Sequence, residues 1–378
     1  MKIVSAVYSH PEYYPPTLNA LNALAVNADE VYCVHRNVKK TNLTYPENVH
    51  LVVSGKFKSI RETEQTSFFW KLLSFFQFIS ILFKTIKKQK PKWVLLYDPF
   101  PFLAYIIIKP FLSYKPKVWY HNHDLLEPKN LGRLSLGKLA YLNEKHNLKN
   151  VDIFSLPAIE RKFFFKLNSF NGECFFLPNY PSVSKSKHTK FPPFKEELRV
   201  IYQGQIGEGH GLEHIISFLR NSSLNITLNI IGVAVDEVFK HKLTTYIESF
   251  QLKNRVKFHD PFPSYEDLLN FSAQHHVGLA IYEPINTQYK TVVTASNKIY
   301  EYIAMGMPVL LFDDDINRLN LEKYDWAKFT DLSTNSLEKN FKDIINAHEN
   351  YAQSAFNTYM VELNYEYYFD KILTEINK

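Results

Sequence analysis

Residues 199–219 read R-V-I-Y-Q-G-Q-I-G-E-G-H-G-L-E-H-I-I-S-F-L, a strand-like run and a helix-like run joined by a glycine-rich turn. The chain has only 11 glycines, and four of them lie in this turn: Gly204, Gly207, Gly209 and Gly211. A backbone without Cβ atoms before a helix lets a phosphate or a sugar approach closely. The segment therefore predicts an anion-binding βα unit of a parallel sheet, and an ordinary tight turn is the alternative.

Strand-like apolar runs alternate with helix-length segments along the whole chain, which predicts parallel sheets flanked by helices. The predicted strands of the first half are Lys2–Tyr8, Glu30–His35, Val49–Ser54, Trp93–Tyr97, Lys117–Tyr120, Asp152–Ser155 and Cys174–Leu177. Those of the second half are Arg199–Tyr202, Thr227–Ile231, Val256–His259, Gly278–Tyr282 and Pro308–Phe312. After Phe312 the strand pattern fades, and Leu337–Lys378 has the apolar spacing of helices. We therefore predict an α/β fold with two Rossmann-like, doubly wound domains.

A length of 378 residues favours two domains. Residues 1–180 are the predicted first domain, and residues 197–355 are the second. Between them, residues 181–196 are rich in Pro, Ser and Lys and have no apolar period, as expected of a linker. Residues 356–378 are predicted to form a C-terminal helix that crosses back to the first domain.

The composition is that of a globular protein. Its 46% hydrophobic and 22% charged residues exclude a disordered chain, a collagen-like fibre and a disulfide-stapled miniature. Cys33 and Cys174, the only cysteines, lie in apolar strand-like runs. We predict buried thiols in a reducing compartment and no thiolate zinc site.

Positive charge is concentrated in the first half of the chain. Residues 1–195 hold 28 Lys and Arg against 13 Asp and Glu, whereas the remaining residues hold 16 against 25. The first half is therefore predicted to face a polyanion. Lys outnumbers Arg 36 to 8, whereas nucleic-acid readers rely on bidentate Arg contacts. An anionic bilayer is thus the expected partner, and nucleic acid is not.

Residues 68–92 have the composition of a membrane-surface helix, because aromatic and aliphatic residues are followed by Lys84, Lys87, Lys88, Lys90 and Lys92. Phe102–Lys117 and Arg161–Lys166 repeat this chemistry. A helix buried against the sheet, with solvated lysines, is the alternative. The uncharged run Leu72–Phe83 has 12 residues, short of the roughly 20 that span a bilayer, so no spanning helix is expected. The start of the chain also lacks the pattern of a secretory signal peptide.

Residues 294–308 read T-A-S-N-K-I-Y-E-Y-I-A-M-G-M-P and predict a helix of about three turns that Gly306 ends. Ser296 or Thr294 supplies its N-cap. Free amides and Lys298 in the first turn suit a diphosphate. Glu301 lies roughly 7–8 Å further along the helix axis than Ser296, which suits a carboxylate that binds a ribose. A surface pair of Lys298 and Glu301 at i, i+3 is the alternative.

A third motif, W-Y-H-N-H-D at residues 119–124, stands where a predicted strand ends. The carboxyl edge of an open parallel sheet is where ligands bind. His123 or His121 is predicted to hydrogen-bond the reacting sugar or acceptor, with Asp124 fixing the ring tautomer, or to act as general base if the reaction inverts. A metal site of two His and an Asp is the alternative. The loop of residues 10–16 is expected to shape the acceptor pocket.

Two motifs carry a resemblance to a known family. Residues 203–213 read Q-G-x-x-x-x-x-x-G-L-E, and residues 296–309 read S-N-K-x-x-E-Y-x-x-x-G-x-P-V. They resemble the nucleotide-sugar half of GT-B glycosyltransferases, close to glycosyltransferase family 4. The resemblance implies two Rossmann-like domains facing a cleft, with the acceptor bound by the first domain and a nucleotide-sugar by the second. It also implies a retaining, metal-independent transfer with no cofactor besides the donor substrate.

The chain departs from this family at two points. The usual Arg and Lys after the glycine turn, which neutralise the donor diphosphate, are matched by Gln205 and His210. Lys298 and the helix N-terminus must then carry more of that charge. Of the family's paired glutamates, the second matches Glu301 and the first falls on Val293, for which Glu283 is the predicted substitute.

The resulting hypothesis is a cytoplasmic glycosyltransferase, peripheral on the inner face of the cell membrane, that moves a sugar from a nucleotide-diphosphate donor to a glycan or lipid-linked envelope acceptor. The predicted donor-binding residues are Gly204, Gln205, Gly207, Gly209, His210, Ser296, Asn297, Lys298 and Glu301. The predicted catalytic residues are His121, His123, Asp124 and Glu283. Two alternatives stay open: a nucleotide-sugar 2-epimerase of the same fold, and a non-catalytic nucleotide-sugar-binding protein docked on the membrane.

Overall fold

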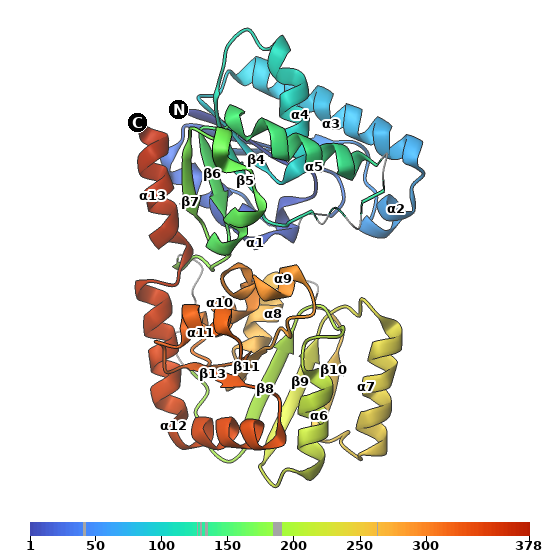
Figure 1. Cartoon of the computed structure of the whole chain (residues 1–378), viewed down its shortest axis with the longest axis vertical. Helices are drawn as coiled ribbons and strands as arrows, with labels where there is room; N and C mark the ends of the chain where they lie inside the picture. Colours follow the sequence, from blue (N-terminus) through green and yellow to red (C-terminus); the bar gives the residue numbers. More distant parts are fainter. Residues whose placement is uncertain (41–42, 127, 129–130, 133–134, 184–190, 263) are drawn as a thin grey trace. The chain divides into compact units, whose positions relative to one another are not determined.

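The computed structural model describes residues 1–378 except 41–42, 127, 129–130, 133–134, 184–190 and 263. The chain forms two compact units (Figure 1). Unit 1 comprises Met1–Pro178 and Tyr368–Lys378, and unit 2 comprises Asn179–Tyr367. Part of the predicted linker, residues 184–190, lies outside the described residues.

Unit 1 is built on a parallel sheet whose strands, within the described residues, follow the order β3-β2-β1-β4-β5-β6-β7. These strands are β1 (Lys2–Val7), β2 (Glu30–Arg36), β3 (Val49–Ser54), β4 (Trp93–Tyr97), β5 (Lys117–His121), β6 (Ile153–Leu156) and β7 (Glu173–Phe176). The helices are α1 (Pro15–Asn27), α2 (Ile60–Gln65), α3 (Phe68–Gln89), α4 (Pro99–Ile108) and α5 (Leu136–Asn147), with short 3-10 turns η1 (Pro11–Tyr13), η2 (Lys109–Phe111), η4 (Leu148–Asn150), η5 (Ile159–Phe164) and η6 (Leu167–Ser169). The strand order reverses between β1 and β4, which makes the carboxyl ends of these strands a switch point where ligands bind in such sheets.

Unit 2 repeats this architecture with the described strands in the order β10-β9-β8-β11-β12-β13, again all parallel. They are β8 (Leu198–Gln203), β9 (Ile226–Ile231), β10 (Val256–His259), β11 (Val277–Ala280), β12 (Val309–Phe312) and β13 (Ala327–Thr330). The helices are α6 (Leu212–Asn221), α7 (Glu237–Ser249), α8 (Tyr265–Ser272), α9 (Thr287–Lys290), α10 (Asn297–Ala304), α11 (Asp315–Leu321), α12 (Thr334–Val361) and α13 (Tyr365–Asn377), with the 3-10 turn η8 (Val293–Ala295). Its switch point lies between β8 and β11.

Each sheet buries one apolar face under its own helices. In unit 1 the core joins β1, β4, β5 and β6 to α3 and α4. In unit 2 it joins β8, β9 and β11 to α6, α7 and α12. The α/β prediction is confirmed, and every predicted strand is present within two residues of its predicted bounds. The fading of the strand pattern after Phe312 was misleading, because the short edge strand β13 pairs with β12 through Val309 and Ala327.

The last helix of the chain, α13, starts in unit 2 and ends in unit 1. From Tyr368 onward it packs on the sheet of unit 1. There the indole Nε1 of Trp93 donates to the carbonyl oxygen of Ile376 at 3.0 Å, and Phe369 lies against Trp119. Of the two cysteines, Cys33 is buried, whereas Cys174 on the edge strand β7 is only half-buried, which corrects the expectation that both thiols are buried.

Helix α3 packs one face against the sheet of unit 1, beside α4, and its other face is exposed (Figure 1). The packed face contributes Phe75, Phe78, Ile79, Leu82 and Ile86 to the core. The exposed face carries Phe68, Phe69, Trp70, Leu73 and Phe76. With 22 residues and a mean hydropathy of 1.4 over its most apolar window, the helix is long and apolar enough to cross a membrane by length and composition. Because α3 extends beyond the uncharged run Leu72–Phe83 at both ends, the length of that run does not exclude a spanning helix, and the expectation of none stays a prediction.

Candidate functional site

The glycine turn joins β8 to α6 and is packed tightly against the loop that follows β9. Gly204 has φ 134°, and its N–H donates to Ile231 O at 2.9 Å. A Cβ atom on Gly232 would lie 1.6 Å from Gly204 O, so the two backbones touch. Gly209 and Gly211 also have positive φ, and Gly211 is the N-cap of α6. Backbone packing therefore accounts for much of the glycine content, and the ligand argument must come from the side chains around the turn.

Lys298 supplies that argument, because its ammonium group lies beside Gly204. A Cβ atom on Gly204 would lie 3.1 Å from Lys298 Nζ. The ammonium sits over the rings of Tyr202, 4.2 Å from the centroid, and Tyr282, at 4.9 Å. Within the described part of the chain no carboxylate reaches it within salt-bridge distance. Burial lowers the pKa of Lys298 to about 7, and the negative charge of Glu301 offsets part of this shift. A buried cation without a direct counterion is costly, and a bound anion would offset that cost.

The first turn of α10 is capped as predicted, although the helix spans only the eight residues Asn297–Ala304. Ser296 Oγ accepts from Ile299 N at 3.5 Å and shares a 3.0 Å hydrogen bond with Tyr282 OH. Thr294 Oγ1 and Asn297 Oδ1 are buried and have no partner among the described residues. Polar atoms left unpaired at a helix start are suited to an incoming ligand.

Gly306 ends α10 in a Schellman motif. It has φ 68°, its N–H donates to Ile303 O, and Met307 N donates to Tyr302 O, both at 3.0 Å. A Cβ atom at position 306 would also lie 2.2 Å from ring atoms of Phe191, so only glycine fits here. The second motif is thus a capped helix of about two turns rather than three.

Glu301 is buried and already has two partners. Its carboxylate accepts from Gln203 Nε2 on β8 and from Tyr265 OH on α8. Gln203 in turn accepts from Ser272 Oγ at 2.7 Å. Burial raises the pKa of Glu301 to about 6, against the hydrogen bond from Tyr265 and the charge of Lys298. Each carboxylate oxygen keeps a second lone pair, so the predicted ribose contact is chemically open and stays a prediction.

His210, a predicted donor-binding residue, is held by hydrogen bonds within unit 2. Its ring is buried, Nδ1 donates to Ile281 O at 3.2 Å, and Nε2 accepts from Tyr289 OH at 3.0 Å. Burial and then Lys298 lower its pKa to about 3, so the ring is neutral and both nitrogens are used. His210 therefore cannot replace the cation that neutralises a diphosphate. Gln205 is exposed at the turn, and its carbonyl accepts from Tyr202 OH.

The other predicted residues of unit 2 lie around the same turn. Gly207 packs against Val235, where an added Cβ would lie 2.9 Å from Cγ2. Glu283 lies shortly after β11 and is half-buried, and its backbone N–H donates to Gly209 O at 2.9 Å. Val293, which replaces the family's first glutamate, is a buried apolar side chain. We call Tyr202, Gly204, Tyr282, Ser296, Lys298 and Glu301 the Lys298 cluster.

In unit 1 the sheet register places three aromatic side chains in one row at its carboxyl edge. Val7 pairs with His35 and Tyr97, and Tyr97 pairs with His121. His121 is buried, and its Nδ1 shares a 2.8 Å hydrogen bond with Ser155 Oγ. Burial, then His123 and Arg161, lower its pKa well below the usual value, so the ring is neutral. Its Nε2 is buried without a partner among the described residues.

His123 lies between two tyrosine rings and beside a carboxylate that sequence reasoning missed. Its ring stacks on Tyr14 (5.3 Å, 26°) and on Tyr97 (5.1 Å, 19°). Nδ1 is 3.3 Å from Asp98 Oδ2, while Asp98 Oδ1 accepts from His123 N at 2.7 Å. Asp124, predicted to fix the tautomer, is exposed and does not contact the ring; its N–H donates to Asp98 Oδ1 at 3.3 Å. Asp98, rather than Asp124, therefore lies where a carboxylate could fix the ring tautomer of His123.

Arg161 is a second residue whose role the sequence did not show. It was predicted to belong to a basic surface segment, yet it is only 1% exposed and its guanidinium donates to His123 O. Asp98 could have been found, because it follows β4 just as Asp124 follows β5 and adjacent parallel strands end at one edge. We call Tyr14, Tyr97, Asp98, His121 and His123 the histidine cluster. Across the described residues no group of three His, Cys, Asp or Glu side chains is arranged to hold a metal ion, and metal independence stays a prediction.

Comparisons with known proteins identify the fold. No family model matches the chain, and no curated protein matches its sequence. Among solved structures, a glycosyltransferase from Rickettsia africae is similar at TM-score 0.70 and 11% identity, covering 100% of this chain and 98% of that one. Sucrose-phosphate synthase from Thermosynechococcus elongatus is similar at TM-score 0.69 and 12% identity, covering 100% of this chain and 98% of that one. Anabaena HepE in complex with UDP and glucose is similar at 0.65 and 13%, covering 100% and 99%. The chain therefore has the GT-B fold of glycosyltransferases.

Proposed function

We propose that this protein is a glycosyltransferase that uses a nucleotide-diphosphate sugar as donor. The fold it shares with glycosyltransferases, one of them solved with UDP and glucose, supports this class. In the proposed assignment unit 2 binds the donor. The diphosphate lies against the N-terminus of α10 and Lys298, and Glu301 accepts a hydrogen bond from the ribose.

The single observation that carries the proposal is the buried ammonium of Lys298. It lies beside the glycine turn, at the start of a helix, with two aromatic rings and no carboxylate in direct contact within the described residues. Helix N-terminus, cation and Gly204 all favour an anion at the same place. The carboxylate of Glu301 lies further along the same helix, so a cation would face the anionic diphosphate and a hydrogen-bond acceptor would face the ribose hydroxyls.

Unit 1 is the proposed acceptor-binding unit. His123 and His121 each present a buried Nε2 without a partner in the described residues, which suits hydrogen bonds to sugar hydroxyls. We propose that this edge faces the reacting sugar and the acceptor, that the acceptor is a cell-envelope glycan or lipid-linked sugar, and that transfer is retaining and metal-independent, as in family 4. The lysine-rich charge of residues 1–195 supports an acceptor at an anionic membrane.

The donor assignment is tested by thermal unfolding with a panel of nucleotide-diphosphate sugars. A ligand at 100 times its dissociation constant adds about 2.7 kcal/mol to the free energy of unfolding. Glu301→Ala is expected to weaken the stabilising sugar at least tenfold and to lower transfer. Glu144→Ala is the matched control, because Glu144 is also a buried glutamate held by a tyrosine and an amide, but in unit 1. Unchanged donor affinity and transfer in Glu301→Ala would falsify the assignment.

Product analysis with the donor alone separates transfer from the alternatives. A glycosyltransferase is expected to leave the sugar configuration at C2 unchanged and to consume the donor only when an acceptor is present, apart from slow hydrolysis. Interconversion of two nucleotide-sugars would instead identify an epimerase. Binding without any turnover across a broad acceptor panel would identify a non-catalytic protein.

Peripheral membrane attachment on the cytoplasmic side is proposed for α3. Because its packed face belongs to the core of unit 1, we propose that the helix lies on the membrane rather than across it, with the exposed face of Phe69, Trp70 and Phe76 in the headgroup region. Sedimentation with anionic liposomes is expected to be salt-sensitive and to fall several-fold in Trp70→Glu. Leu319→Glu, at a 78% exposed leucine on α11, is the control. Equal sedimentation of both variants and the wild type would exclude this surface.

A further inference from the structure

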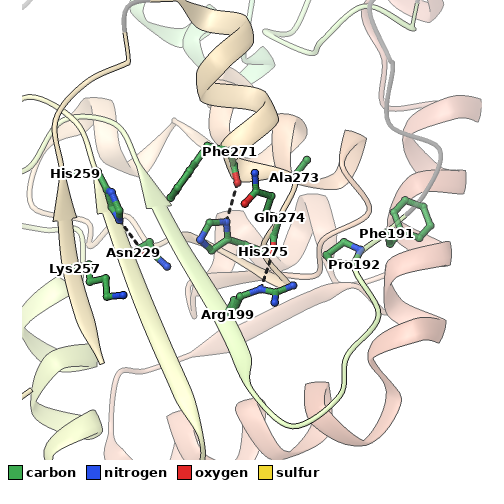
Figure 2. A pocket seen from close by; sticks show the side chains of 10 residues that line it. All are labelled: Phe191, Pro192, Arg199, Asn229, Lys257, His259, Phe271, Ala273, Gln274 and His275. Carbon is green, nitrogen blue, oxygen red and sulfur yellow. Dashed lines mark hydrogen bonds between the residues drawn. The ribbon is translucent and has the colours of Figure 1, made fainter. Parts of the chain in front are cut away.

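Unit 2 has a pocket that shares no residue with the Lys298 cluster. It has a volume of about 690 Å³, within the range of small-molecule sites. Its floor is formed by side chains of β8, β9 and β10, and its walls by the end of α8 and by Phe191 and Pro192 ahead of β8 (Figure 2). This pocket has no part in the donor assignment above, so an inference about it is independent of that function.

The sheet face beneath the pocket carries polar side chains. Along β9, Ile226, Leu228 and Ile230 are buried in the core, whereas Thr227 and Asn229 between them are only half-buried. Asn229 pairs with Lys257 on β10, so two polar side chains stand next to each other on this face. Parallel sheets are normally covered by apolar side chains on both faces. A polar strip at this position therefore marks a surface built for contact with water or a ligand.

The charged groups of the pocket are cations. Arg199 and Lys257 line it, and no Asp or Glu does among the residues that the structure describes. Arg199 is held in place because its Nε donates to Gln274 O at 2.8 Å. His259 Nε2 donates to Asn229 Oδ1 at 2.7 Å, which leaves the Asn229 amide nitrogen as a donor (Figure 2). Burial and then Lys257 lower the pKa of His259, so the positive charge comes from Arg199 and Lys257.

The remaining wall is flat and apolar. Phe271 closes the pocket at the end of α8, held against the rings of His259 (4.9 Å) and His275 (5.1 Å). Phe191 and Pro192 contribute apolar surface from the segment that precedes β8 (Figure 2). An aromatic wall beside two cations and an amide donor is complementary to an organic anion with a flat ring.

We propose that this pocket binds a small organic anion, with its charged group on Lys257 and the Asn229 amide in the field of Arg199, and with its flat part against Phe271. Phenyl phosphate is the probe, and ligand-observed NMR on the whole chain measures its binding. It is expected to bind at least tenfold more tightly than inorganic phosphate, because phosphate alone cannot use the apolar wall. Equal binding of the two, or no binding of phenyl phosphate at about 10 mM, would overturn the proposal.

Four variants test where the probe binds. Lys257→Glu reverses an exposed charge and is expected to weaken phenyl phosphate at least tenfold. Asn229→Asp keeps the acceptor for His259 but replaces the donor by an anion, and it is expected to weaken binding at least fivefold. Lys242→Glu makes the same charge change on α7, which packs on the opposite, apolar face of the sheet, and it should leave binding unchanged. If Lys298→Met weakens phenyl phosphate and Lys257→Glu does not, the probe sits at the Lys298 cluster and the proposal is wrong.

Discussion

Two buried glutamates, one in each unit, have the same kinds of partner and different chemistry. Glu301 accepts from Tyr265 OH and an amide of Gln203. Glu144 on α5 accepts from Tyr120 OH and, at 3.0 Å, from the amide of Asn122. Burial raises the pKa of both, to about 6 for Glu301 and to about 8 for Glu144. Burial and two neutral donors therefore do not by themselves make a binding carboxylate.

The difference comes from the neighbouring charge. Lys298 stabilises the ionised form of Glu301, whereas Asp98 disfavours the ionised form of Glu144. Unit 2 thus holds a buried cation and a carboxylate that ionises near neutral pH, a combination that attracts a ligand with both anionic and hydroxyl groups. Unit 1 instead offers the neutral imidazole of His121, whose buried Nε2 has no partner among the described residues and suits uncharged hydroxyls.

The largest expected effect is that of Lys298→Met, which removes the charge and keeps the length of the side chain. Donor affinity is expected to fall about 100- to 1000-fold, because a charge-assisted contact to the diphosphate is lost. The ligand-free protein should be as stable as the wild type or more so, since a buried unpaired charge disappears. Calorimetric donor titration and thermal unfolding of the same samples measure the two effects.

The control for this variant is Lys290→Met, which removes an exposed lysine from α9 in the same unit. It should change neither donor affinity nor stability. A Lys298→Met protein that is destabilised and still binds donor normally would show that the lysine serves the fold, and the distinction between the two units would lose its basis.

Asp98→Asn tests the other unit with a smaller expected effect. Asparagine keeps the acceptor for His123 N and tolerates the positive φ of 68° at this position. Loss of the charge beside His123 Nδ1 is expected to lower kcat about 10- to 100-fold while donor affinity stays within about twofold, because Asp98 acts by positioning the imidazole. Steady-state kinetics with separately varied donor and acceptor measure this. A change in donor KM with normal kcat would contradict the positioning role.

Much of the fold was predictable because buried parallel strands are continuous apolar runs. β4 and β10 match their predicted bounds, whereas β13 was missed because A-K-F-T is short, half-exposed and contains a lysine that pairs with Asp343. The helix predicted over residues 68–92 is observed as α3, Phe68–Gln89. Local apolar pattern thus predicts central strands well and short edge strands poorly.

The candidate site was predictable only where its residues share one motif. Ser296, Lys298 and Glu301 stand on one helix, so their order along its axis followed from the sequence. The aromatic cage of Lys298 did not, because Tyr202 and Tyr282 come from separate segments that meet only in the sheet. Likewise, the sequence analysis named Asp124 and missed Asp98, because only the register and the turn after β5 decide which carboxylate lies beside the imidazole.

The last prediction is a pH dependence of stability that separates the two glutamates. Folded Glu144 keeps its proton to about pH 8, whereas in the unfolded chain the carboxyl ionises near its ordinary pKa of 4.5. The folded state therefore binds more protons between these values, and this group's contribution to the free energy of unfolding falls as pH rises. Glu144→Gln stays neutral and keeps an acceptor for Tyr120, so at pH 9 it should be more stable than the wild type by on the order of 4 kcal/mol, and close to it at pH 5.

The corresponding gain for Glu301→Gln should be smaller and complete earlier. The pKa of Glu301 rises only to about 6, so its contribution is lost between about pH 4.5 and 6 and is level above that. Urea unfolding of both variants and the wild type from pH 5 to 9 measures the two curves. If Glu301→Gln gained stability up to pH 8 and Glu144→Gln did not, Lys298 would not be lowering the pKa of its neighbour. The cation would then have to be paired elsewhere, and the chemical difference between the two sheet edges would disappear.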